Sequence, residues 1–148
     1  MADVVSPETR SRMMSGIRGK DTKPEVLVRK ALHARGFRYR LHVSDLPGRP
    51  DIVLPRYKAA LFVHGCFWHG HDCRFFKLPG TRPEFWRLKI GKNRANDEKN
   101  VALLSGAGWR TGIVWECALR GQNTSVDAVA DRLAEWLEST SANIEIRE

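Results

Sequence analysis

The 148-residue chain lacks the features of membrane-spanning and secreted proteins. No run approaches the roughly 18 uninterrupted apolar residues that a membrane-spanning helix needs. The first residues, MADVVSPETRSRMM, contain no apolar stretch of the kind found in a secretory signal. Three cysteines are too few, and odd in number, for a disulfide framework. We therefore expect a cytoplasmic protein with no membrane partner, whose cysteines serve metal or thiol chemistry.

Internal repeats, low-complexity tracts and long linkers are also absent from the sequence. Hydrophobic residues make up 42% of the chain and charged residues 28%, close to the average for soluble globular proteins, so one packed core is expected. We expect an N-terminal arm over residues 1–20, one domain over residues 21–138, and a flexible C-terminal tail over residues 139–148.

The chain carries an excess of positive charge, with 25 Lys and Arg against 17 Asp and Glu. Residues 1–110 hold 22 of the basic and 10 of the acidic side chains, so the excess belongs to the first three quarters. It favours a polyanionic partner, above all nucleic acid; the alternative is a solvated basic surface that only keeps the protein soluble. Aromatic rings interleaved with basic side chains favour nucleic acid, because rings stack on bases while cations pair with phosphates. These aromatic residues are Phe67, Trp68, Phe75, Phe76, Phe85 and Trp86.

Residue patterns predict three helices and four strands. The segment Thr22-Lys23-Pro24-Glu25 is typical of a capping box and predicts a helix over residues 23–35, which Gly36 ends. Apolar runs predict strands over residues 37–41, 51–54, 59–64 and 109–115, the second and third forming a hairpin. The other helices are expected over residues 84–105, with an interruption near Gly91, and over residues 126–137.

This order of elements predicts an α/β protein in which a mixed sheet is flanked by helices. The strand at residues 59–64, the following helix and the strand at residues 109–115 form a strand–helix–strand unit. Such a unit makes its two strands parallel neighbours, so their carboxyl ends should lie on one edge of the sheet.

Four possible metal ligands crowd into HGCFWHGHDC, residues 64–73, and they are Cys66, His69, His71 and Cys73. The remaining cysteine, Cys117, follows the strand ending at residue 115 by two residues, as Cys66 follows the strand ending at residue 64. Parallel pairing would bring both together, and Cys66, His71, Cys73 and Cys117 would then form a closed structural zinc site. The alternative is that Cys117 is a small buried hydrophobic residue and the histidines lie on the surface.

A closed zinc site leaves no position for water, so a catalytic centre would lie elsewhere. The candidates are Glu25, Asp51, His64 and His69. Asp51 opens a strand after Gly48-Arg49-Pro50, where one carboxylate can hold Mg²⁺ together with water; a carboxylate that only caps a turn is the alternative. Imidazoles exchange protons near neutral pH, and phosphodiester hydrolysis needs a metal, a base for water and a charge partner for the phosphate.

Five segments of the chain resemble the very short patch repair (Vsr) endonucleases, and the similarity covers about residues 8–138. The segments are LPGRPDIVLP, FVHGCFWHGHDC, TRPEFW, IGKN and GWRTGIVWECALRG. The resemblance implies a restriction-endonuclease-like fold with a mixed central sheet, flanking helices and a structural zinc. It also implies an enzyme that nicks double-stranded DNA 5′ to the T of a T·G mismatch, left when 5-methylcytosine deaminates, with Mg²⁺ as cofactor. We expect a monomer, because one nick needs one active site.

The resemblance also implies a role for each candidate residue. Asp51 corresponds to the family's metal-binding aspartate, and the backbone carbonyl of Val63 completes the Mg²⁺ site. His69 corresponds to the general base or its proton relay, His64 to the histidine beside the scissile phosphate, and Glu25 to a carboxylate that supports the water network. The family's zinc ligands correspond to Cys66, His71, Cys73 and Cys117.

For the aromatic residues, the resemblance implies DNA contacts. Phe67, Trp68 and Trp86 correspond to side chains that wedge into the duplex beside the mismatch. Met14 in the N-terminal DNA-binding arm is expected to approach from the minor-groove side, and Lys89 and Asn93 to lie near the mismatch. Ordinary core is the alternative for aromatic residues, and strand and helix periodicity favours it for Phe75, Phe76, Trp109, Trp115 and Trp136.

One motif common in restriction-fold nucleases is missing, an acidic residue followed two positions later by lysine. The corresponding strand reads Phe62-Val63-His64, which is usual within the Vsr family. Two other functions remain open: a nuclease of the same fold with another mismatch or double-strand specificity, and a non-catalytic zinc module that binds damaged DNA. The presence of both Asp51 and His69 favours the enzymes.

Overall fold

A computed structural model describes residues 22–120 and 124–148 of the protein. Met14 and the expected arm over residues 1–20 lie outside these ranges. The described elements are α2 (Lys23–Ala34), β1 (Arg40–Leu41), β2 (Ile52–Leu54), the 3-10 turn η1 (Pro55–Tyr57), β3 (Ala59–His64), α3 (Pro83–Gly106), β4 (Arg110–Trp115), α4 (Cys117–Arg120), α5 (Val126–Leu137) and β5 (Asn143–Ile146). None of the helices in these ranges combines the length and the apolar character needed to cross a membrane.

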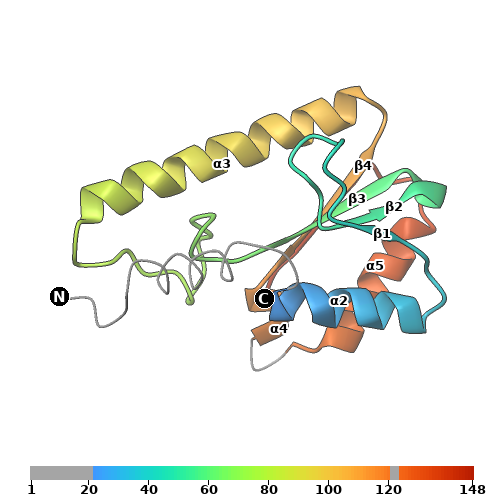
Figure 1. Cartoon of the computed structure of the whole chain (residues 1–148). Helices are drawn as coiled ribbons and strands as arrows, with labels where there is room; N and C mark the ends of the chain where they lie inside the picture. The colour runs from blue at the N-terminus through green and yellow to red at the C-terminus, as the bar shows by residue number, and fades with distance from the viewer. Residues whose placement is uncertain (1–21, 121–123) are drawn as a thin grey trace, which may run out of the picture.

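The strands form one mixed sheet in the order β1-β2-β3-β4-β5. Strands β1, β2 and β3 are antiparallel, whereas β3, β4 and β5 run parallel. The long helix α3 lies on one side of the sheet, and α2 and α5 lie on the other (Figure 1). The structure therefore confirms the predicted mixed α/β arrangement and the parallel pairing of β3 with β4.

Strand β3 is buried on both faces, because each face packs against a helical layer. Ala59 and Leu61 belong to the larger core, which also contains residues of α2 and α5 such as Leu32 and Leu133. Ala60 and Phe62 point the other way and pack with Leu104 of α3. A continuous apolar run is what a strand between two layers requires, and this alternation directs the side chain of His64 to the α3 side.

The predicted capping of α2 is confirmed. The Thr22 hydroxyl accepts a hydrogen bond from the backbone N–H of Glu25 at 3.4 Å, and Pro24 lies in the first turn. The helix ends at Ala34, and Gly36 follows with a positive φ of 91° that L-residues rarely adopt. This end fixes where the chain turns towards β1 and the catalytic candidates beyond it.

The element bounds differ from the prediction by one residue in several places, and two features differ more. Strand β1 contains only Arg40 and Leu41, because Phe37 and Tyr39 pack against the core instead of pairing, with the Tyr39 hydroxyl donating to the carbonyl of Arg29. The interruption expected near Gly91 does not occur, since α3 runs unbroken for 24 residues. One glycine costs a helix only about 1 kcal/mol, which the packing of α3 on the sheet offsets.

The flexible tail predicted over residues 139–148 is wrong for its second half. Residues Asn143–Ile146 form β5, which pairs in parallel with β4, and Ile146 is buried in the larger core. A strand of four residues carries too short an alternating pattern to be recognised, and its pairing partner lies thirty residues earlier. The short helix α4, which begins at Cys117, was also not predicted.

Candidate active site and metal centre

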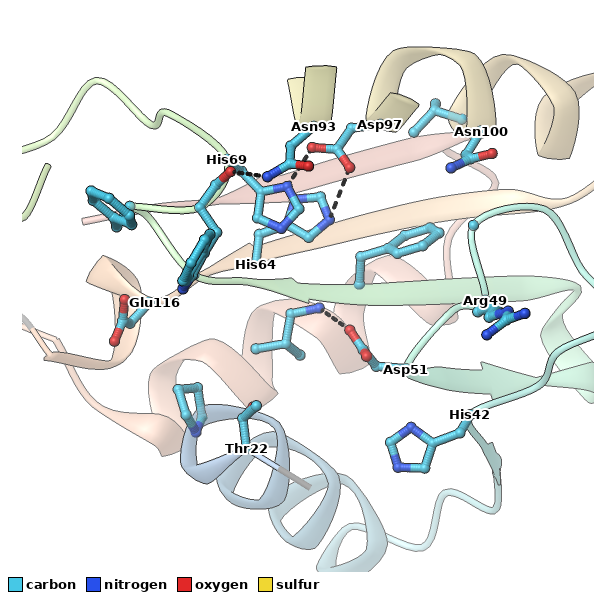
Figure 2. Close-up of a pocket in the computed structure, with 18 of the residues that line it drawn as sticks. Thr22, His42, Arg49, Asp51, His64, His69, Asn93, Asp97, Asn100 and Glu116 are labelled. Carbon is cyan, nitrogen blue, oxygen red and sulfur yellow. Dashed lines mark hydrogen bonds and ion pairs between the residues drawn. The ribbon is translucent and has the colours of Figure 1, made fainter. Parts of the chain in front are cut away.

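A cavity of about 850 Å³ opens beside the carboxyl ends of β3 and β4, between α2 and α3. Its lining includes Asp51 ahead of β2, His64 at the end of β3 and His69 in the loop that follows β3. Figure 2 shows Asp51 below, the two histidines and Asp97 above, and Arg49 to one side. Three of the four predicted catalytic residues, Asp51, His64 and His69, therefore face one shared space, and the fourth, Glu25, is not among its lining residues.

Asp51 is held at this cavity by the neighbouring strand. Its Oδ2 atom accepts a hydrogen bond from the backbone N–H of Val63 at 2.8 Å, which places the carboxylate beside the end of β3. Burial raises the pKa of Asp51, and the hydrogen bond from Val63 partly opposes that effect. A divalent cation would favour the ionised form of Asp51. The role of a metal ligand therefore fits this buried carboxylate better than the role of a turn cap.

Glu25 lies next to Asp51 and is only 1% exposed. Its Oε2 atom lies 3.0 Å from the Arg29 guanidinium and 3.3 Å from Nε2 of His42. Glu25, His42 and Asp51 offer ligand atoms within 4.8 Å of one another, a group that can hold a metal ion. His42 could not be predicted from the sequence, because it stands alone after β1 and no motif connects it with a helix that begins almost twenty residues earlier.

The two histidines predicted to be catalytic lie against each other. The rings of His64 and His69 stack with centroids 3.8 Å apart and planes 6° apart. Nδ1 of His69 lies 2.5 Å from Oδ2 of Asp97, and Nε2 of His64 lies 4.0 Å from the other carboxylate oxygen. Burial, with a smaller contribution from His69, lowers the pKa of His64 to about 3, so His64 is neutral at physiological pH.

Asp97 was not among the predicted site residues. It lies on α3 within a polar stretch, NRANDEKN, in which it looks like any other solvated helix residue. A carboxylate on Nδ1 of His69 fixes the proton there and leaves Nε2 as a proton acceptor. The imidazole can therefore take a proton from a water molecule in the cavity.

The four predicted zinc ligands come together. Cys66, His71, Cys73 and Cys117 offer ligand atoms that all lie within 4.8 Å of one another, and the three cysteines form no disulfide. Residues 64 and 115 are opposite each other in the parallel β3–β4 pair, so the chain after each strand reaches the same place. The prediction from strand geometry that Cys117 joins the others is confirmed.

The distances and burial of this cluster fit zinc. Sγ of Cys117 lies 3.6 Å from Nδ1 of His71, and two such ligands on one tetrahedral zinc would lie about 3.5 Å apart. Burial lowers the pKa of His71, which keeps the imidazole neutral as a ligand must be. Burial also raises the pKa of the Cys66 thiol, and a bound cation would offset that effect by stabilising the thiolate.

Trp115 connects the cluster with the histidines of the cavity. Its ring stacks on His71 with centroids 4.0 Å apart and makes a T-shaped contact with His64, with centroids 5.2 Å apart. The buried indole of Trp115 therefore lies between the Cys/His cluster and the two predicted catalytic histidines, so a shift of His71 would displace the ring that His64 contacts. Trp115 and Trp136 are buried as predicted, whereas Phe75, Phe76 and Trp109 are only partly buried.

The three predicted wedge residues form one aromatic group beside the cavity. Phe67 makes T-shaped contacts with Trp68 and Trp86, with ring centroids 5.2 and 5.3 Å apart. The ring centroids of the two tryptophans lie 5.6 Å apart. The side-chain amide of Asn93 donates to the backbone carbonyl of Trp68 at 2.8 Å, so α3 holds this loop. Lys89 lies one turn earlier on α3 and is partly exposed.

Comparisons with known proteins find a matching family model and similar chains. The family model described as DNA mismatch endonuclease Vsr matches residues 2–75. DNA mismatch endonuclease Vsr of Escherichia coli is 47% identical over 148 residues, covering 98% of this chain and 95% of that protein. Type II nicking enzyme V.XorIIP of Xanthomonas oryzae pv. oryzae is 52% identical over 119 residues, which is 80% of this chain and 88% of the relative. Type II nicking enzyme V.NmeAIP of Neisseria meningitidis is 46% identical over 122 residues, or 82% and 87% of the two chains.

Proposed function

Because the chain belongs to the Vsr family of DNA mismatch endonucleases, we propose that it nicks one strand of double-stranded DNA 5′ to the T of a T·G mismatch. The mismatch would arise by deamination of 5-methylcytosine, and the nick would begin very short patch repair. The observation that carries the proposal is the shared cavity, where Asp51 and the His64–His69–Asp97 group face the same space beside the aromatic group. We further propose that residues 21–138, to which β5 adds a strand of the same sheet, form a restriction-endonuclease-like nuclease domain.

Asp51 and the backbone carbonyl of Val63 are the proposed ligands of Mg²⁺. Their proximity supports this role, since the Val63 amide and the Asp51 carboxylate are hydrogen-bonded. A bound Mg²⁺ would supply positive charge to the scissile phosphate and to the oxygen that leaves it. Glu25, fixed by Arg29 and adjacent to Asp51, is suited to orient water at this ligand set.

His69 is the proposed general base. With Nδ1 directed to Asp97, Nε2 takes a proton from the water whose oxygen attacks phosphorus, and the bond to the leaving sugar oxygen breaks. His64 stays neutral and stacked beneath His69, from where its imidazole can donate a hydrogen bond to a phosphate oxygen without an unpaired buried charge. The absence of the acidic residue and lysine from β3 is thereby compensated by two imidazoles.

The Cys66, His71, Cys73 and Cys117 cluster is the proposed structural zinc site. Zn²⁺ at a closed four-ligand site would hold the loop in one conformation rather than take part in hydrolysis. This loop carries both Phe67 and Trp68 and, directly after them, His69. The proposed zinc site would therefore fix the positions of the wedge residues and the general base relative to each other.

Phe67, Trp68 and Trp86 are the proposed wedge into the duplex. Inserting side chains between base steps costs a few kcal/mol per step, and this cost is lowest where pairing is already faulty. Insertion would thus favour mismatched sites. The N-terminal arm with Met14, together with Lys89 and Asn93 of α3, is proposed to contact the same duplex, on which one monomer acts.

A strand-specific cleavage assay tests the proposal. A duplex with one T·G pair, labelled differently on each strand, is incubated with the protein with and without Mg²⁺. We expect one cut, 5′ to the T, only when Mg²⁺ is present. Cleavage of both strands or of fully paired DNA would favour a nuclease of other specificity, and binding without any cut would favour a non-catalytic damage-binding module.

A further inference from the structure

The residues that follow β5 reach back to the metal cluster. Arg147 binds Asp72 twice, with Nη1 2.7 Å from the carboxylate and Nη2 3.1 Å from the backbone carbonyl. Asp72 lies between two of the proposed zinc ligands, His71 and Cys73. Arg147 therefore holds the main chain of the ligand loop as well as one of its side chains.

The next residue contacts a third ligand. The backbone N–H of Glu148 lies 3.4 Å from Sγ of Cys117 and donates to it. The Glu148 carboxylate pairs with Arg74 at 2.9 Å, on the other side of Cys73 from Asp72. The two ion pairs are of opposite polarity, since the loop supplies the acid in one and the base in the other. Together they fix the main-chain N–H that points at the sulfur.

A third contact comes from β5 itself. Oε1 of Glu145 accepts a hydrogen bond from the indole N–H of Trp115 at 2.6 Å. Trp115 is the residue stacked on His71, so this bond holds the ring against which the histidine ligand lies. Every contact comes from a four-residue stretch, and each reaches a ligand or the immediate neighbour of one.

We propose that residues 145–148 form a clasp that closes the Cys/His cluster and determines how tightly it retains its metal. This proposal rests on the proposed zinc site. A donor on a thiolate sulfur and fixed partners around ligand side chains preserve ligand geometry, and loss of such partners typically weakens metal binding about 10- to 100-fold. The clasp would also give β5 a role, since its pairing with β4 brings Arg147 and Glu148 to the cluster.

Metal release from the full-length protein tests the clasp without reference to nicking. Bound zinc is counted in the purified protein, and its transfer to a chromogenic chelator in excess is followed over time. We expect Arg147→Ala to release zinc about 2- to 10-fold faster than the unsubstituted chain, because the ion pair with Asp72 is exposed while the second bond holds the main chain of the ligand loop. The matched control is Arg87→Ala, which removes an arginine paired with Glu84 on α3, distant in the sequence from every ligand, and should leave the rate unchanged.

A charge exchange separates a specific contact from a general loss of packing. Arg147→Asp alone should release zinc rapidly, whereas Arg147→Asp combined with Asp72→Arg should recover most of the original retention. An unchanged release rate in Arg147→Ala, or no recovery in the exchanged pair, would overturn the clasp. A wild-type protein that binds no zinc would instead contradict the zinc site itself, so the two failures are distinguishable.

Discussion

Asp51 stands in an environment that opposes its charge. It is largely buried, and burial raises its pKa above the ordinary value of 3.8. Residues that chemistry requires often cost stability in this way. The proposed Mg²⁺ would remove the conflict, because the cation stabilises the ionised carboxylate.

Replacing Asp51 should therefore separate stability from activity. We expect Asp51→Asn to lose nicking but to melt higher without divalent metal, with a gain of about 1 kcal/mol or roughly 2–4 °C at neutral pH. Folding raises the pKa of Asp51, so below pH 3.8 the carboxyl is protonated in both the folded and the unfolded protein and does not destabilise the fold. The cost of its buried charge grows as the pH rises from 3.8 through the pKa of the folded protein. The gain in melting temperature of Asp51→Asn should therefore vanish near pH 4. Melting curves at neutral pH and at pH 4 measure the gain. The control is Asp45→Asn, at an exposed position. A gain that persists in acid would contradict the explanation.

Asp97 should act through the ring of His69. Its loss leaves both ring nitrogens free to carry the proton, so a fraction of the protein would present the wrong nitrogen to water. We expect Asp97→Ala to lower the single-turnover nicking rate by about 10²- to 10⁴-fold. In ¹⁵N spectra, His69 should change from one Nδ1-protonated form to a mixture. Glu98→Ala, at the exposed neighbouring position, is the control, and an unchanged His69 spectrum in Asp97→Ala would refute the role.

The helices and strands that position these residues contain two glycines that differ in how much space surrounds them. In β4, a Cβ on Gly112 would lie 2.6 Å from Leu61 and 3.2 Å from both Ile144 and Trp136. In α3, a Cβ on Gly91 would meet no atom within 4 Å. The first glycine permits close approach inside the core, whereas the second only weakens an exposed helical turn.

Alanine at the two positions should thus have opposite effects on stability. We expect Gly112→Ala to lower the free energy of unfolding by about 1–3 kcal/mol, because buried neighbours must shift. Gly91→Ala should raise it by about 0.5–1 kcal/mol through helix propensity. Urea unfolding of both variants measures the two effects. Equal effects of the same sign would show that the close packing around Gly112 does not constrain the fold.

Elements with a local signal could be predicted, and those that depend on distant contacts could not. The capping box at Thr22 and the apolar run of β3 contain their own evidence, and parallel pairing then placed Cys117 beside Cys66. Strand β5 is short, and Asp97 and His42 carry no motif, so tertiary contacts alone reveal them. Gly91 misled the prediction because packing of a long helix outweighs one unfavourable residue.

At the level of the complete fold, two centres share one edge of the sheet. The carboxyl ends of β3 and β4 carry His64 and Trp115 side by side, with the metal cluster beyond them and the cavity in front. Helix α3 spans this edge and contacts the intervening loop through Asn93 and Asp97 (Figures 1 and 2). Loss of the proposed zinc should therefore disorder the proposed wedge and general base together, so removal of zinc should reduce mismatch binding as well as nicking.

The central claim is that Asp51 and His69 act together on one phosphodiester. It is tested most directly by single-turnover nicking of the T strand in a T·G duplex, using Asp51→Ala, His69→Ala and the double variant with saturating Mg²⁺. Groups that act as a unit are not additive, so we expect each single variant to lose nearly all activity and the double variant to be no slower than the slower single one. Near wild-type cutting by either single variant, or losses that add in the double variant, would contradict the claim.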